Sequence, residues 1–417
     1  MVEIINIGDE LLIGQVVNTN ASWMAEQLNL SGFRVHQVTI VSDSRQHILQ
    51  ALTEAESRAG IVLISGGIGP TKDDITKHTL CEFFNTRLVF NQEAFDAVEK
   101  MFARRGYAVT ELNRLQAELP EGCTGIPNPL GTARGMWFEK DRLTGGKTIF
   151  VSMPGVPFEM KAMMTDYVIP WLKKIFDTPF IFHKTILTQG IGESFLAAQI
   201  ADWENGLPEN IKLAYLPQPG IVRLRLTGTG IEEQVRLQTG EAVAMLQKLI
   251  PDSIFGYDDD TLEEIVGELL RQRNATLATA ESCTGGYLAH LITGIPGSSA
   301  YFKGSVVAYA NSVKESLLGV DPESLKNYGA VSKEVVAEMA LGAQRRFNAD
   351  YVIATSGVAG PDGGTPEKPV GTIWIAIATP EKVQPFHYLF GDSRDRNIRR
   401  TALQALNLLR KAINREI

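Results

Sequence analysis

The chain has 417 residues, of which 44% are hydrophobic and 21% are charged, a composition typical of a folded globular protein with two to three domains. Its formal net charge of −8 argues against a general nucleic-acid binder, because phosphate contacts need clustered lysines and arginines. No apolar run approaches the ~20 residues of a membrane span, and Met1 leads directly into a strand pattern rather than into a signal peptide. Together with three widely spaced cysteines, these features predict a cytoplasmic protein with no membrane or nucleic-acid partner.

Strand and helix patterns alternate through the first 64 residues. Apolar runs at residues 2–7, 34–41 and 61–64 predict strands, and residues 21–30 and 44–58 have the patterning of helices. This alternation indicates a parallel sheet with right-handed crossovers. Ligands of such sheets bind beyond the carboxyl ends of the strands.

Two loops are expected at that edge of the sheet. The first carries Asp9 and Glu10, and the second spans residues 65–76. The glycines and helix-start amides of the second loop suit a phosphate, and the acids of both loops suit a hard divalent cation carried with it. The residues of interest in the second loop are Gly66, Gly67, Gly69, Thr71, Asp73 and Asp74. Alternatively, this is an ordinary glycine-rich turn in which the two aspartates are solvated acids of the first helical turn.

The middle of the chain, from residue 179 to residue 250, predicts a small α+β module without a catalytic constellation. Its expected strands and helices are residues 185–188, 193–203, 212–216, 221–227 and 232–249. Arg223 and Arg225 alternate on one strand, which is typical of a solvated face. The acidic stretch at residues 251–260 predicts a linker, after which Thr261 opens a helix with a capping-box pattern.

The last third is organised around Ser282, which follows an apolar strand at residues 276–280 and precedes a predicted helix at residues 287–293. A nucleophile on this tight turn lies near the positive end of the helix dipole, which favours an alkoxide. Gly285 and Gly286 let a substrate approach the backbone closely. The alternative is a capping hydroxyl followed by glycines that ease packing.

Two further turns can lie beside Ser282 in a parallel sheet. Tyr309 ends one predicted strand and Lys314 follows on the next helix, whereas Ser356 follows another strand and opens a loop rich in free amides. Serine, lysine and tyrosine can form a nucleophile with its base, and none of the six histidines falls in these loops. Taken singly, Lys314 also fits a solvated first-turn lysine and Tyr309 a strand-end aromatic. The remaining expected elements are strands at residues 305–309, 351–355 and 370–378 and a basic helix at residues 394–411.

The loops of the front half match a known fold. The stretch 8–76 and the Pro/Gly loops at residues 128–133 and 153–157 resemble the molybdopterin-binding fold of the MogA, MoaB and MoeA proteins. In particular, they resemble its variant at the front of the CinA (competence/damage-inducible) family.

The loops of the last third match the same family. Residues 281–286, 309–314 and 356–361 resemble, in order and spacing, the CinA C-terminal domain, a nicotinamide-nucleotide amidase that also occurs as the stand-alone protein PncC. The resemblance implies three domains. They are a molybdopterin-binding-like α/β domain at residues 1–172, a KH-like α+β module at residues 173–255 and an α/β CinA amidase domain at residues 256–417.

For the last domain, the resemblance implies hydrolysis of nicotinamide mononucleotide to nicotinic acid mononucleotide and ammonia, a step of pyridine nucleotide salvage that needs no cofactor there. Ser282 is then the nucleophile, and Lys314 and Tyr309 assist its deprotonation and protonate the leaving ammonia. Ser356, where many members have threonine, holds the substrate or orients the base. The other residues implied around the substrate are Thr284, Gly285, Gly286, Asn311, Gly357, Gly360 and, for the phosphate, either Arg396 or Arg399.

For the front domain, CinA relatives imply cleavage of the pyrophosphate of ADP-ribose. A divalent ion (Mg, Mn or Co) would be held by Asp9, Glu10, Asp73 and Asp74, although these residues fit ligand binding without catalysis equally well. The family also suggests a homodimer. A competing hypothesis is a non-catalytic binding or scaffold protein in competence or DNA-damage response. The intact set of Ser282, Tyr309 and Lys314 favours the enzyme.

Overall fold

The computed structural model describes residues 1–71, 74–104, 106–142 and 146–417. They form two compact units, Met1–Phe182 with Thr229–Glu233 and His183–Gly228 with Gln234–Ile417. Within the described ranges, no helix is both long enough and apolar enough to cross a membrane.

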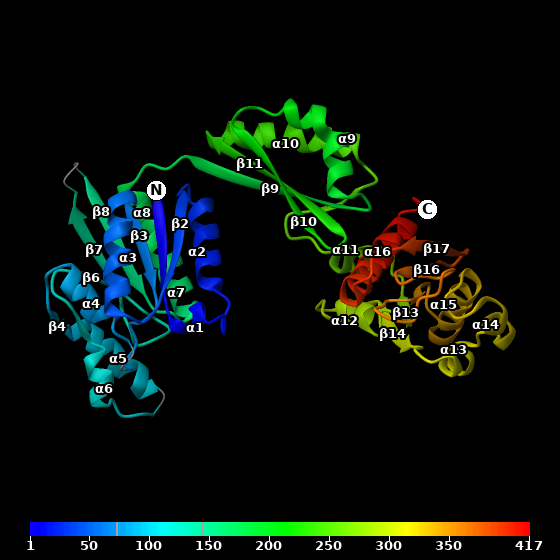
Figure 1. Ribbon diagram of the computed structural model, residues 1–417, viewed down its shortest axis with the longest axis horizontal. Helices are drawn as coiled ribbons and strands as arrows, with labels where there is room; N and C mark the ends of the chain where they lie inside the picture. Colours follow the sequence, from blue (N-terminus) through cyan, green and yellow to red (C-terminus); the bar gives the residue numbers. More distant parts are fainter. Residues whose placement is uncertain (72–73, 105, 143–145) are drawn as a thin grey trace. The chain divides into compact units, whose positions relative to one another are not determined.

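The first unit is built on a six-stranded sheet and a separate two-stranded pair (Figure 1). Its strands are β1 (Val2–Ile7), β2 (Val35–Val41), β3 (Ile61–Ser65), β4 (Leu88–Phe90), β5 (Glu118–Pro120), β6 (Thr124–Ile126), β7 (Gly135–Asp141) and β8 (Lys147–Met153). The order of the large sheet is β2-β1-β3-β8-β7-β6. Its first four strands are parallel, as the alternating pattern predicted, and β7 and β6 extend it in antiparallel fashion.

Helices cover both faces of this sheet. They are α1 (Asp9–Leu12), α2 (Thr19–Leu30), α3 (Arg45–Arg58), α4 (Thr76–Phe83), α5 (Gln92–Arg104), α6 (Glu111–Leu115), α7 (Pro157–Met163) and α8 (Ile169–Ile175), with a π-helical turn at Met164–Val168. Val2 and Ile4 of β1 pack with α2, α7 and α8, whereas Ile5 and Ile7 pack with α3 and α4. This two-residue alternation is that of a strand buried on both faces, so the strand ends are the open part of the sheet.

The middle module is a four-stranded sheet with two helices. Its elements are β9 (Phe180–Gln189), α9 (Glu193–Asn205), β10 (Ile211–Gln218), β11 (Ile221–Gly230), α10 (Glu232–Leu249) and β12 (Ile254–Tyr257), and its strand order is β10-β11-β9-β12. The predicted linker at residues 251–260 was wrong in its centre, because β12 pairs with β9 and buries Phe255. The acidic residues around this short apolar strand had hidden it.

The C-terminal domain is a five-stranded sheet in the order β14-β13-β15-β16-β17. Its strands are β13 (Leu277–Glu281), β14 (Phe302–Val307), β15 (Tyr351–Gly357), β16 (Thr372–Ala378) and β17 (Val383–Leu389). Strands β14, β13 and β15 are parallel, and β16 and β17 are antiparallel. The edge strand β17 was not predicted, because Pro385 interrupts its pattern and proline is tolerated mainly at sheet edges.

Helices pack on both faces of this sheet as well. They are α11 (Leu262–Gln272), α12 (Tyr287–Thr293), α13 (Asn311–Leu318), α14 (Pro322–Tyr328), α15 (Lys333–Phe347) and α16 (Arg394–Ile413), with a 3-10 turn at Ser298–Ala300. Helices α11, α12 and α16 pack into one apolar cluster and α13, α14 and α15 into the other. Leu187 and Phe255 of the middle module belong to the first cluster, so the module and the domain share a core.

Candidate functional site

The carboxyl ends of three parallel strands bring the expected C-terminal residues to one edge of the sheet. The register pairs Glu281 of β13 with Val307 of β14 and with Thr355 of β15. Ser282 and Tyr309 therefore follow adjacent strands at the same level, and Ser356 lies beside them near the end of β15.

Ser282 lies on the tight turn between β13 and α12. Its N–H donates to Thr355 O at 3.0 Å, and its carbonyl accepts from Gly285 N–H at 3.1 Å. Gly285 and Gly286 have φ values of 60° and 97°, which side chains rarely adopt. The turn therefore needs these glycines for its backbone.

Glu281, the residue before the nucleophile candidate, holds the start of α12. Its carboxylate is fully buried and accepts from the N–H groups of Gly286 at 2.9 Å, Leu288 at 3.0 Å and Ala289 at 2.8 Å. Three N–H donors at a helix N-terminus satisfy a buried carboxylate. Glu281 thereby fixes both ends of the Ser282 turn.

Cys283, the residue after Ser282, packs inward. It is 5% exposed and lies in the apolar cluster with Leu288 and Ile292 of α12. Burial raises the pKa of its thiol to about 12, so the thiol keeps its proton near neutral pH. This is the setting of a structural rather than a nucleophilic cysteine.

Lys314, in the first turn of α13, is only 1% exposed, so it is not a solvated lysine. Its Nζ donates to Ala308 O at 2.8 Å and to Tyr309 O at 3.2 Å. Burial lowers the pKa of its amine below the ordinary lysine value. A neutral amine with two N–H groups engaged keeps a lone pair that can accept a proton.

Tyr309 is 61% exposed, and its hydroxyl accepts from Arg394 Nη2 at 3.1 Å. Nη1 of the same arginine donates to Gly360 O at 2.9 Å. Arg399, one of the two arginines considered from the sequence, lies near Glu263 of α11. Burial raises the pKa of the Glu263 carboxyl, and the positive charge of Arg399 opposes that rise. Arg396 is exposed. The arginine that the structure joins to Tyr309 is Arg394.

The remaining expected residues lie around the same edge in different settings. Ser356 is fully buried, and its hydroxyl donates to Ala330 O at 2.6 Å. This bond connects β15 to the loop before α15. Thr284 is buried and shares a 2.8 Å hydrogen bond with Thr355. Asn311 is exposed at the start of α13, Gly357 ends β15, and Gly360 lies in the loop bound by Arg394.

The front domain has its own cavity, of 420 Å³, at the carboxyl ends of its parallel strands. The predicted residues that line it are Glu10, Gly66, Gly67, Gly69 and Asp74. Thr71 donates its N–H to Asp74 Oδ2 at 2.9 Å. Asp9 instead exchanges contacts with Asp43, its N–H donating to Asp43 Oδ2 at 3.0 Å. Asp73, expected among the metal ligands, lies outside the described residues.

Two acids that line the front cavity were not singled out from the sequence. Asp43 and Glu159 line it, and Asn128 donates from Nδ2 to Glu159 Oε2 at 2.6 Å. Glu159 lies in the first turn of α7, directly after a Pro/Gly loop, which is a signal that the sequence does carry. Across the described ranges, no group of three or more His, Cys, Asp or Glu side chains is placed to hold a metal ion by itself.

Two residues of the C-terminal edge were also missed. Glu281 carries the signal of an acid at the end of a strand, one short turn before a helix N-terminus. Arg394 lies three residues before the buried Asn397. Asn397 Nδ2 donates to Ala359 O and Gly391 O. Because residues three apart share a helix face, Arg394 and Asn397 both lie on the face of α16 toward the 359–360 loop.

Family models match the chain in three consecutive segments. "Probable molybdopterin binding domain" matches residues 3–174, "Damage-inducible protein CinA KH domain" residues 183–256, and "CinA C-terminal domain" residues 259–413. These matches follow the order of the α/β domain, the KH-like module and the C-terminal α/β domain described above.

Whole-length relatives agree with the family models. A CinA-like protein of Cytophaga hutchinsonii is 48% identical over 412 residues, covering 99% of this chain and 97% of that protein. Another from Flavobacterium psychrophilum is 46% identical over 416 residues, with 98% of each chain covered. A solved structure of a competence-damaged protein (CinA) superfamily protein from Klebsiella pneumoniae is 31% identical and covers 37% of this chain and 99% of its own, with a TM-score of 0.36. The chain belongs to the CinA family.

Proposed function

We propose that the C-terminal domain is an amidase that hydrolyses nicotinamide mononucleotide to nicotinic acid mononucleotide and ammonia. The observation that carries the proposal is the placement, at one sheet edge, of Ser282 on a tight turn and of Lys314 as a buried amine with a lowered pKa. A serine hydroxyl needs an unprotonated base, and burial of a lysine favours its unprotonated form, so no histidine is required.

In this reaction Ser282 Oγ attacks the amide carbonyl carbon, and its proton passes to the neutral amine of Lys314. The carbonyls of Ala308 and Tyr309 hold two N–H groups of that amine, which leaves the lone pair to take the proton. The C–N bond then breaks, and ammonia leaves with the proton that Lys314 carries. Water attacks the acyl ester, Lys314 takes its proton, and the acid is released as Ser282 regains its hydroxyl.

Tyr309 and Arg394 have binding roles in this proposal. The arginine, held by Gly360 O and the tyrosine hydroxyl, supplies a positive charge for the substrate phosphate. The backbone N–H groups of the Ser282 turn and of the loop after Ser356 would face the developing oxyanion.

The test is ammonia release from nicotinamide mononucleotide by the purified full chain. Ser282→Ala should lose activity by about three orders of magnitude or more. The matched control is Cys283→Ala at the next position, which should keep most of the activity because that thiol is buried in the core and stays protonated. Wild-type turnover by Ser282→Ala, or loss of activity in Cys283→Ala alone, would contradict the mechanism.

We propose a second activity for the front domain, the metal-assisted cleavage of ADP-ribose to AMP and ribose 5-phosphate. It is supported by the 420 Å³ cavity, which is lined by the glycines of the 66–69 loop together with Glu10 and Asp74. Glu10 and Asp74 would hold a divalent ion (Mg, Mn or Co), since Mg²⁺ is commonly bound by one or two carboxylates together with substrate phosphates. That ion would neutralise the charge that develops on the diphosphate.

This activity is tested by AMP release from ADP-ribose with and without excess chelator. Chelation and Asp74→Ala should each abolish it, while ammonia release from nicotinamide mononucleotide continues. Asp166→Ala, an exposed acid of the same unit outside the cavity, is the control and should have no effect. Undiminished AMP release in chelator would exclude the metal role.

A further inference from the structure

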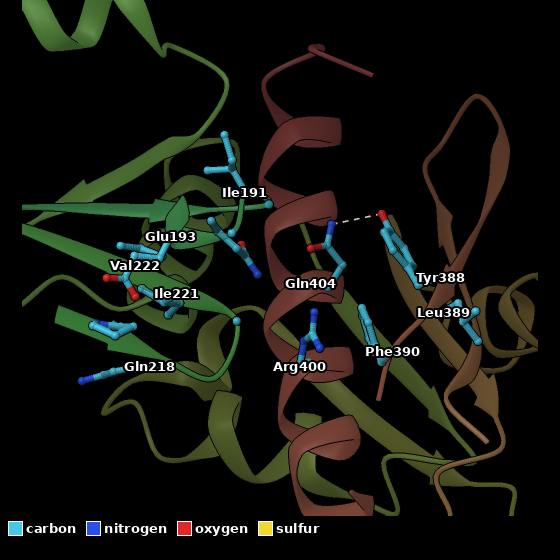
Figure 2. Close-up of a pocket in the computed structure, with 15 residues that line it drawn as sticks. Ile191, Glu193, Gln218, Ile221, Val222, Tyr388, Leu389, Phe390, Arg400 and Gln404 are labelled. Atoms are coloured by element: carbon cyan, nitrogen blue, oxygen red, sulfur yellow. Dashed lines mark hydrogen bonds between the residues drawn. The ribbon is translucent and has the colours of Figure 1, made fainter. Parts of the chain in front are cut away.

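The second unit contains a cavity of 610 Å³ that is separate from the residues around Ser282 (Figure 2). Its walls come from the loop between β9 and α9, the β10–β11 turn, strand β17 and helix α16. The volume lies within the range of about 300–1,000 Å³ that is typical of small-molecule sites.

One wall of this cavity carries a buried polar group without a partner. Gln189, the last residue of β9, lines the cavity and is 4% exposed, and its Oε1 accepts no hydrogen bond from the described chain. A buried carbonyl that accepts no hydrogen bond destabilises the fold. A ligand N–H donor would satisfy it.

The opposite wall combines a cation with aromatic rings. Figure 2 shows Arg400 and Gln404 on α16 near Tyr388 and Phe390. The guanidinium carbon of Arg400 lies 4.5 Å from the Phe390 ring centroid, and no carboxylate of the described residues pairs with it. The Tyr388 and Phe390 rings are 5.6 Å apart and inclined by 24°, and Gln404 Nε2 holds the Tyr388 hydroxyl at 3.0 Å.

These groups match the parts of a nucleotide. A guanidinium with free N–H groups binds phosphate, and a fixed aromatic pair offers a stacking surface for a planar base. Glu193, which also lines the cavity, can accept from ribose hydroxyls. Gln189 Oε1 needs a donor such as an exocyclic amino group.

We propose that this cavity binds an adenine-type nucleoside monophosphate. The phosphate lies at Arg400, the base lies against the Tyr388–Phe390 pair, and the amino group of the base donates to Gln189. The site is separate in the fold from both proposed active sites. It shares helix α16 with Arg394, so its occupant contacts the same helix that reaches Tyr309.

The test titrates AMP into the purified full chain by calorimetry. Arg400→Gln should weaken AMP binding about 10- to 100-fold, because a charge-assisted hydrogen bond contributes about 1.5–3 kcal/mol. Arg400→Lys, which keeps the charge, should recover part of the affinity. Arg345→Gln, an exposed arginine of α15 outside the cavity, should bind like wild type. Adenosine and ribose 5-phosphate, each lacking one half of AMP, should bind at least tenfold more weakly.

Photolabelling with 8-azido-AMP locates the site. Label should appear in peptides that contain Gln189–Glu193 or Tyr388–Phe390, and excess AMP should prevent it. The proposal is overturned if AMP does not bind, if Arg400→Gln binds it as wild type does, or if label appears only in residues 65–76 or 282–286. Equal affinity for ribose 5-phosphate would overturn the stacking role.

Discussion

Burial shifts the pKa values of two side chains at the Ser282 edge of the sheet, Cys283 and Lys314. Desolvation disfavours the charged form of either group, so it raises the pKa of the Cys283 thiol and lowers that of the Lys314 amine. Both are thereby shifted toward their neutral forms. The same environment that keeps the cysteine unreactive favours the neutral amine that the proposed role of Lys314 as a base requires.

The pH dependence of the proposed amidase should follow Lys314. Ammonia release should rise with pH as this amine loses its proton, with the midpoint below the ordinary lysine value of about 10.4. The measurement is kcat/KM for nicotinamide mononucleotide against pH. A midpoint at the ordinary lysine value would contradict the role.

The stability of the fold should depend on the same group. Between the lowered pKa of the folded state and about 10.4, the unfolded chain binds a proton that the folded chain does not, so the free energy of unfolding rises with pH in that window. Lys314→Met should flatten this rise in urea unfolding measured at several pH values. An unchanged slope would show that Lys314 does not titrate there.

At the scale of single elements, the buried carboxylate of Glu281 accepts the N–H groups at the start of helix α12. Glu281→Gln keeps the shape of the side chain but replaces one acceptor oxygen by an NH2 donor. The N–H groups of Gly286, Leu288 and Ala289 are then left with one acceptor oxygen in place of two. We expect a loss of about 1–3 kcal/mol in the free energy of unfolding.

The control for this variant is Glu264→Gln in the exposed first turn of α11, where the carboxylate accepts from the Thr261 hydroxyl. Its cost should stay below about 0.5 kcal/mol, because the site is solvated. Equal losses in the two variants by denaturant unfolding would exclude a special role for burial at Glu281.

Elements with simple periodicity were predictable from the sequence, and those defined by distant contacts were not. The strand before Ser282 and the helix after it follow from an apolar run and paired glycines. Strand β17 lacks such a pattern, since Pro385 interrupts it, and β16 stabilises it from outside the local sequence. The bond between Arg394 and Tyr309 joins residues 85 apart, so only the fold could select this arginine. The buried hydroxyl of Ser356 likewise finds its partner, Ala330, through tertiary packing.

At the scale of the second unit, the KH-like module and the C-terminal domain share one core. Leu187 and Phe255 pack with the cluster that contains α11 and α16. Removing the module exposes the apolar surface that they cover, and each such side chain contributes about 1.5–3 kcal/mol.

A fragment of residues 257–417 should therefore melt at a lower temperature than one of residues 183–417, which retains the shared core. Thermal unfolding followed by circular dichroism compares the two fragments. Equal melting temperatures would mean that the shared cluster adds nothing to the domain.

All three thiols of the molecule are held in their protonated form. Burial raises the pKa of Cys81, raises that of Cys123 to about 11 and raises that of Cys283 to about 12. Peroxides and other oxidants attack the thiolate, so the chain offers them little to react with near neutral pH. The proposed amidase relies on the Ser282 hydroxyl rather than on a thiol, so it should keep its activity at peroxide concentrations that inactivate thiol-dependent enzymes.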